Sequence, residues 1–160
     1  MSFLRFLMLL SLVVWIGGII FLAFVEAPIA FAPGLLPTRH MAGSIVGHSL
    51  DRLHHMGLVA GVIFLFSSAL YYRMTAGRAR PLALRHILLA LMMVLTMISQ
   101  YAVSPKMYAL REQAVVIDNL QPDDPIRREF NRLHVWSENF EKAVLLLGLI
   151  ALFRTAQELE

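Results

Sequence analysis

Residues 4–27 read LRFLMLLSLVVWIGGIIFLAFVEA, and their only charged groups stand near the two ends, at Arg5 and Glu26. About 20 consecutive apolar residues are enough to cross the hydrocarbon core of a bilayer as a helix. The run is also longer than the apolar region of a signal peptide, which covers about 7–15 residues. We therefore expect a membrane helix that is retained in the protein.

Three further apolar stretches follow, at residues 53–72, 82–103 and 135–153. In hydrocarbon every backbone polar group must be bonded within the protein, which a helix achieves by itself. The sequence therefore predicts an all-α fold, an integral membrane bundle of four antiparallel transmembrane helices. Because the four stretches use most of the 160 residues, we expect a single four-helix transmembrane domain over residues 1–160.

Composition restricts the function. The chain has no cysteine, which excludes disulfides and thiolate metal sites. Its net charge of +3, without a basic helix, does not indicate a nucleic-acid partner. No nucleophile elbow, phosphate loop or catalytic triad is present, so the sequence does not indicate an enzyme. The expected partners are the lipid bilayer and either other membrane subunits or further copies of the same chain.

The short connection between the second and third stretches carries basic residues and no acid, namely Arg73, Arg78, Arg80 and Arg85. Short loops rich in Lys and Arg stay in the cytoplasm. We therefore expect both termini to be cytoplasmic, the first and third connections to face outward, and the protein to lie in a bacterial inner membrane.

Helix ends and contact points are also indicated. Pro28 and the prolines after it predict a break following the first helix, and Thr38 is a suitable N-cap for an early start of the second. Pro105 predicts the end of the third helix. Gly57 and Gly61 are expected to face another helix, because small residues allow close approach in lipid.

The fourth stretch is the most informative about function. Its uninterrupted apolar run, residues 143–153, is too short to span a bilayer, so the helix must begin near His134. His134, Glu138 and Glu141 then share a face at spacings of four and three. Because exposing carboxylates to lipid is costly, we expect this face to point into the bundle.

Other polar groups are expected at the same level of the bundle. Together they define a candidate metal site at His134, His55, His54, Glu26, Glu138 and Glu141. Imidazole and carboxylate are suitable ligands for a divalent transition metal, and two histidines on different helices could ligate haem. Alternatively, the cluster is only a polar cap in which Glu138 pairs with Lys142, four residues further on.

Several short motifs suggest a family. They are Trp15-Ile16-Gly17-Gly18, Glu26-Ala27-Pro28, Ala42-Gly43, Val46-Gly47, Ser104-Pro105-Lys106-Met107, Arg111, Phe130, His134 and Ser137. In these the chain resembles the domain of unknown function 4149 family, four-helix membrane proteins similar to transmembrane protein 205. The resemblance implies the four-span fold and no particular reaction. His54, His55, Glu138 and Glu141 lie outside the family pattern.

Two functions remain open at this point. The first is a membrane-embedded binding protein, with a His/carboxylate pocket near the outer face for a metal ion, haem or a small polar ligand. The alternative is a non-catalytic accessory subunit of a larger membrane complex, which the small size and the glycine-rich helix faces favour.

Overall fold

Long helices account for most of the structure, a computed structural model that describes residues 2–76, 84–114 and 116–158. The described residues contain no strand. The α-helices are α1 (Ser2–Phe21), α2 (Ala27–Ala30), α3 (Arg39–Ala76), α4 (Leu84–Ile98), α5 (Ser104–Ala114) and α6 (Pro125–Glu158). A single 3₁₀ turn, Ile117–Asn119, lies in the connection before α6.

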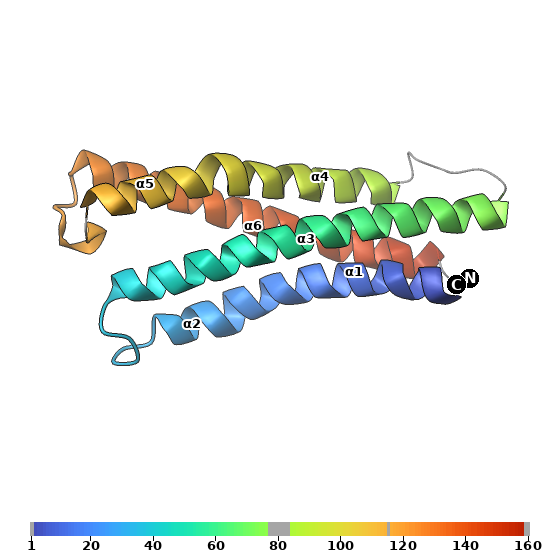
Figure 1. Cartoon of the computed structure of the whole chain (residues 1–160), viewed down its shortest axis with the longest axis horizontal. Coiled ribbons are helices and arrows are strands. Elements are labelled where there is room, and N and C mark those ends of the chain that lie inside the picture. The colour runs from blue at the N-terminus through green and yellow to red at the C-terminus, as the bar shows by residue number, and fades with distance from the viewer. Residues whose placement is uncertain (1, 77–83, 115, 159–160) are drawn as a thin grey trace.

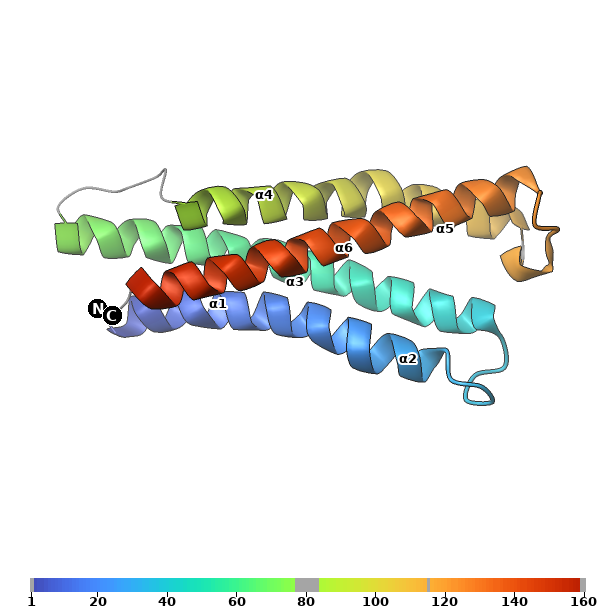
Figure 2. The same ribbon diagram turned by 180° about the vertical axis from the view of Figure 1, so that it is seen from behind.

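These helices form four antiparallel rods (Figure 1), because α1 continues into α2 and α4 continues into α5. Both termini lie at one end of the bundle, the terminal end, and the α2–α3 and α5–α6 connections lie at the other, the loop end. The first rod contacts α3 and α6, and α4 contacts the same two helices from the other side (Figure 2). The expected all-α bundle of four antiparallel helices is confirmed.

Three of the four rods are long and apolar enough to cross a membrane: Ser2–Ala30, Arg39–Thr75 and Leu84–Ala114. They include three of the four predicted spans, apart from residues 82 and 83, which lie outside the described part of the chain, as do Arg78 and Arg80. The fourth predicted span, residues 135–153, lies in α6, which is not among these apolar rods. Helix α6 is less apolar but packs along α1 and α4 as the fourth rod. The three apolar rods indicate a membrane protein.

The first rod passes through Pro28 without ending there. The five residues before Ala27, Leu22–Glu26, are π-helical, and the Ala27 N–H donates to the carbonyl of Leu22, five residues earlier. Proline lacks an N–H and its ring collides with the carbonyl four residues before it. The wider π turn accommodates both defects, so the expected break comes only after Ala30.

A second π-helical segment allows the third rod to continue through Pro105. Ser99–Val103 is π-helical, and the Ser104 N–H donates to the carbonyl of Ser99. The prediction that Pro105 ends the helix is wrong, because the chain continues as α5 to Ala114. Local π adjustments of this kind satisfy the backbone groups that a proline frees inside a membrane.

The start of α3 agrees with the sequence. The loop before it turns at Gly34, whose φ of +79° lies in the left-handed region that glycine adopts without strain. The Met41 N–H donates to Thr38 Oγ1 at 3.1 Å, which confirms Thr38 as the N-cap.

Trp15 lies at the centre of the core and is 1% exposed. A Cβ atom on Gly57 would overlap the Trp15 indole, and one on Gly61 would lie 2.9 Å from Met93 Sδ and 3.1 Å from Trp15 Cζ3. The prediction that these glycines contact another helix is confirmed. The Trp15 side chain of α1 therefore packs against the glycine face of α3.

We predict that Gly57→Leu lowers the free energy of unfolding by about 1–3 kcal/mol, because the rigid indole cannot move aside. Gly17→Leu is the matched control, since a Cβ at Gly17 meets nothing within 4 Å. Both variants can be compared by denaturation of the protein in detergent micelles. Equal stabilities of the two variants would contradict this packing.

Candidate functional site

A buried histidine joins three rods inside the bundle. His54 of α3 is 1% exposed. Its Nε2 lies 2.7 Å from Glu141 Oε1 of α6, and its Nδ1 lies 2.7 Å from Gln100 Oε1 of the π-helical segment. The Glu141 side chain is 15% exposed. A base and an acid are therefore held in contact, away from the surface, by side chains from three separate segments.

Each ring nitrogen of His54 faces one oxygen. An imidazolium donates from Nε2 to the Glu141 carboxylate and from Nδ1 to the Gln100 amide oxygen. A neutral imidazole keeps both contacts if the carboxyl group carries the proton and donates it to Nε2. Both arrangements satisfy the two contacts, so the geometry allows His54 and Glu141 to share one proton.

Two further hydroxyl groups lie on the rod that supplies Gln100. Thr96 is 1% exposed and Ser99 is 0% exposed, and within the described ranges neither hydroxyl oxygen has a hydrogen-bond partner. Thr96 and Gln100 are four residues apart, and Ser99 is Gln100's neighbour in the sequence. The rod that supplies Gln100 therefore also buries two hydroxyl groups whose hydrogen-bonding capacity is unused.

Two of the other candidate ligands lie on the outside of α6. The His134 side chain is 56% exposed and that of Glu138 is 49% exposed, and the two groups are 3.2 Å apart. Glu138 also accepts a hydrogen bond from Lys142 at 2.9 Å. The expectation that His134 and Glu138 point into the bundle is wrong, whereas Glu141 does point inward.

The rotation of α6 explains this difference. Its buried face is marked by Leu133, Ser137 and Val144. At 100° per residue, Glu141 lies about 60° from the centre of that face and Glu138 about 120° from it. The long side chain of Glu141 can therefore turn inward, whereas that of Glu138 cannot.

His55 and Glu26 do not join the cluster either. His55 is exposed, and its Nδ1 donates to the Asp51 carbonyl at 2.7 Å. Neighbouring residues on a helix point about 100° apart, so the inward position of His54 turns His55 away. Glu26 is half-buried and, among the described residues, makes no hydrogen bond or ion pair. In the same part of the chain, no three His, Asp or Glu side chains are close enough to hold a metal ion.

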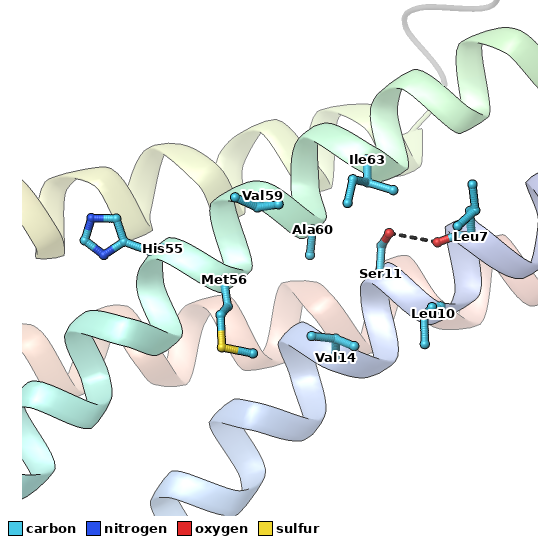
Figure 3. Close-up of a pocket in the computed structure, with 9 residues that line it drawn as sticks. All are labelled: Leu7, Leu10, Ser11, Val14, His55, Met56, Val59, Ala60 and Ile63. Atoms are coloured by element: carbon cyan, nitrogen blue, oxygen red, sulfur yellow. Dashed lines mark hydrogen bonds between the residues drawn. The ribbon is translucent and has the colours of Figure 1, made fainter.

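An apolar groove of about 410 Å³ lies between α1 and α3, and His55 stands at one end of it (Figure 3). Its lining is otherwise aliphatic apart from Met56 and Ser11, whose hydroxyl donates to the Leu7 carbonyl at 2.8 Å. Neither His54 nor Glu141 lines it. The groove is therefore separate from the buried His54 cluster.

A second polar cluster, near the loop end, was not predicted from the sequence. The Tyr108 hydroxyl donates to Asp51 Oδ2 at 2.8 Å. The Arg111 guanidinium lies over the Phe130 ring, 5.2 Å from its centroid, and against Gly43. Asp51 Oδ1 and Arg111 Nη1 are buried without a hydrogen-bond partner among the described residues.

This cluster lies beyond the predicted spans. Burial, followed by the bond to the Asp51 carboxylate, raises the pKa of Tyr108 above its usual value, so the phenol stays protonated and keeps donating. One signal in the sequence could have indicated the cluster. Gly43, Gly47 and Asp51 recur every four residues and so form one face of α3, on which Tyr108 and Arg111 pack.

We predict a coupling free energy of roughly 1–2 kcal/mol between His54→Ala and Glu141→Ala in a double-mutant cycle, the upper range for polar contacts between membrane helices. The cycle of His134→Ala with Glu138→Ala is the matched control. It joins the same residue types on the exposed face, where a pair contributes less than about 0.5 kcal/mol. Unfolding in detergent measures both, and equal coupling in the two cycles would contradict the buried contact.

Comparison with known proteins supports the family and adds no reaction. The family model described as Domain of unknown function (DUF4149) matches residues 10–115, which is more than half of the chain. No curated protein and no solved structure matches this chain. The matched part contains His54 and Gln100, together with Asp51, Tyr108 and Arg111 of the second cluster, and it ends before α6. The chain therefore belongs to the domain of unknown function 4149 family.

Proposed function

We propose that the protein is a membrane-embedded binding protein whose site is the cluster of His54, Gln100 and Glu141. The observation that carries this proposal is the contact of 2.7 Å between His54 Nε2 and Glu141 Oε1 in the bundle interior. Ionisable groups are costly inside a membrane, and where they occur they usually belong to a binding site or a proton path.

The geometry favours a small polar ligand over haem or a metal ion. Both nitrogens of His54 are already bonded, whereas a haem ligand must offer one to the iron. His54 and Glu141 supply two metal ligands, and a tetrahedral metal ion needs about four. A proton is the smallest ligand that fits, because His54 and Glu141 can exchange it without rearrangement.

The decisive experiment is infrared difference spectroscopy of the protein in lipid nanodiscs between acidic and basic pH. We expect a carboxyl band that disappears in Glu141→Gln and remains in Glu138→Gln, the matched control on the same helix. A wild-type spectrum that Glu141→Gln leaves unchanged would refute proton binding at this site. Metal analysis and an absorption spectrum of the same sample test the other ligands. A stoichiometric metal would identify a metal ion as the ligand in place of the proton, and a Soret band would identify haem.

The second candidate is a non-catalytic accessory subunit of a larger membrane complex. The exposed apolar groove between α1 and α3 favours it, because another membrane helix could fill that groove. In this case the His54 cluster would serve only to hold three rods together. Co-purification from mild detergent with a stable stoichiometric partner, combined with a pH difference spectrum that does not depend on Glu141, would select this function.

We further propose that both termini lie in the cytoplasm of a bacterium and that the loop end faces outward. The acid-free run of arginines between α3 and α4 supports this orientation. It would place the His54 cluster in the outer half of the bundle, since His54 is nearer the start of α3 than its end.

This orientation predicts the labelling of single cysteines, which the cysteine-free chain makes unambiguous. A membrane-impermeant thiol reagent added to intact cells should label Asp123→Cys in the loop before α6 and spare Ser2→Cys. Both positions are exposed, so access to the thiol is equivalent once the cells are lysed. The reverse labelling pattern would place the termini outside.

A further inference from the structure

The apolar groove between α1 and α3 lies inside the membrane-spanning part of the bundle. Its α3 side runs from His55 to Ile63, and its α1 side runs from Val14 to Leu7. Because the two helices are antiparallel, both sides run in this order from the loop end toward the terminal end (Figure 3). Both also belong to rods that are apolar enough to cross a membrane. The medium that surrounds the groove is therefore lipid.

The length of the groove matches one leaflet of a bilayer. His55 and Ile63 lie about 12 Å apart along α3 at 1.5 Å per residue, and Val14 and Leu7 lie about 10 Å apart along α1. The hydrocarbon core is about 30 Å thick, so each leaflet contributes about 15 Å. An acyl chain enters from one surface and fills one leaflet, whereas a partner helix crosses the whole core. The groove therefore fits an acyl chain better than it fits a helix.

His55 provides a hydrogen-bonding group at the loop end of the groove. It is the only ionisable side chain in the lining and is exposed. Its Nδ1 donates to the Asp51 carbonyl, and its Nε2 has no hydrogen-bond partner among the described residues. An imidazolium at this position has an N–H at Nε2 that is available to an anionic oxygen.

Arg52 provides a fixed positive charge at the same end. It precedes His55 by three residues and Met56 by four, so it lies on the groove face of α3, one turn nearer the loop end. Helical side chains lean toward the N-terminus of their helix, and a long Arg side chain near the end of a span reaches the membrane surface. Arg52 is exposed and, in the described part of the chain, makes no hydrogen bond or ion pair. Its charge is therefore available to a ligand.

The α1 side leaves room beside these basic groups. Trp15 packs against Gly57, so Gly17, two residues further along α1, lies near the level of His55. Gly17 follows Val14 by three residues and so shares its face of α1. A Cβ atom at Gly17 would meet nothing within 4 Å. The open space at this level suits the part of a lipid where the acyl chains join the headgroup.

We propose that the groove binds one anionic phospholipid of the leaflet at the loop end. One acyl chain lies along the aliphatic lining, and the phosphate meets Arg52 and His55. Arginine binds phosphate through charge-assisted hydrogen bonds, and basic side chains at the membrane surface attract anionic lipids. A zwitterionic headgroup carries an ammonium that offsets the phosphate charge, so the net charge favours the anionic lipid. This inference does not rest on the proposed binding at His54.

Native mass spectrometry of the full chain in detergent micelles tests the acyl-chain contact. Phosphatidylglycerol titrated into the wild type should be retained as one bound lipid. Val59→Trp should weaken this binding about tenfold, because the indole takes the space of the acyl chain. Val62→Trp is the matched control and should leave binding unchanged, since Val62 is as exposed as Val59, 57% against 59%, but does not line the groove. Equal binding by the two variants, both folded by circular dichroism, would overturn the proposal.

The headgroup contact is tested by the same titration. Phosphatidylcholine with the same acyl chains should bind the wild type about tenfold more weakly than phosphatidylglycerol. The double variant Arg52→Gln with His55→Gln should bind the two lipids equally. Arg73→Gln, at an exposed position near the other end of α3, should keep the preference. A wild type without the preference, or a double variant that retains it, would refute recognition of the phosphate.

Photo-cross-linking in vesicles locates the lipid. A phosphatidylglycerol with a photoactivatable acyl chain, diluted into phosphatidylcholine, should label the groove residues Met56, Val59 and Ile63 more strongly than Val62 and Phe66. Both of the latter are exposed on the same helix but do not line the groove. Equal labelling of the two sets would refute a specific site. A helix of another protein that cross-links to the groove in native membranes and excludes the lipid would also refute it.

Discussion

Hydrocarbon offers a polar group neither a hydrogen-bond donor nor an acceptor, and this constraint shapes the interior of the bundle. Pro28 and Pro105 each free a backbone carbonyl, and each is preceded by a π-helical turn that rearranges the local bonding. The His54 ring meets an oxygen at both nitrogens. Inside the bundle, the ionisable side chains of His54 and Glu141 contact each other from different helices.

The close approach of α1 and α3 has a different physical basis. Apolar surface gains little by moving from lipid to protein, so membrane helices associate through close packing and a few polar contacts. Trp15 fits against Gly57 and Gly61, which supplies dispersion contacts over the area of a whole indole. The His54 cluster provides the polar counterpart, and it ties α3 to α6 and to the third rod. Packing and hydrogen bonding thus link different pairs of rods, and the four rods are held together by both.

The long apolar stretches predicted the fold, because the bilayer dictates both the length and the helical state of a spanning segment. The glycine contacts and the Thr38 cap followed from local chemistry and were also correct. The candidate site was only partly predictable. Spacing placed His134, Glu138 and Glu141 on one broad face, but the rotation of α6 against its neighbours decides which of them turns inward, and that depends on packing distant in sequence. The Asp51–Tyr108–Arg111 cluster was missed for the same reason, since it joins residues nearly sixty positions apart.

The two π-helical turns also affect how this chain should be compared with its relatives. A π turn accommodates one residue more than an α-helical turn, so Leu22–Glu26 and Ser99–Val103 each behave as a one-residue insertion. A relative whose third rod is α-helical throughout would align with a single gap before its counterpart of Pro105. An alignment without that gap would shift every position of α5 by about 100° and pair Tyr108 and Arg111 with residues on the wrong face.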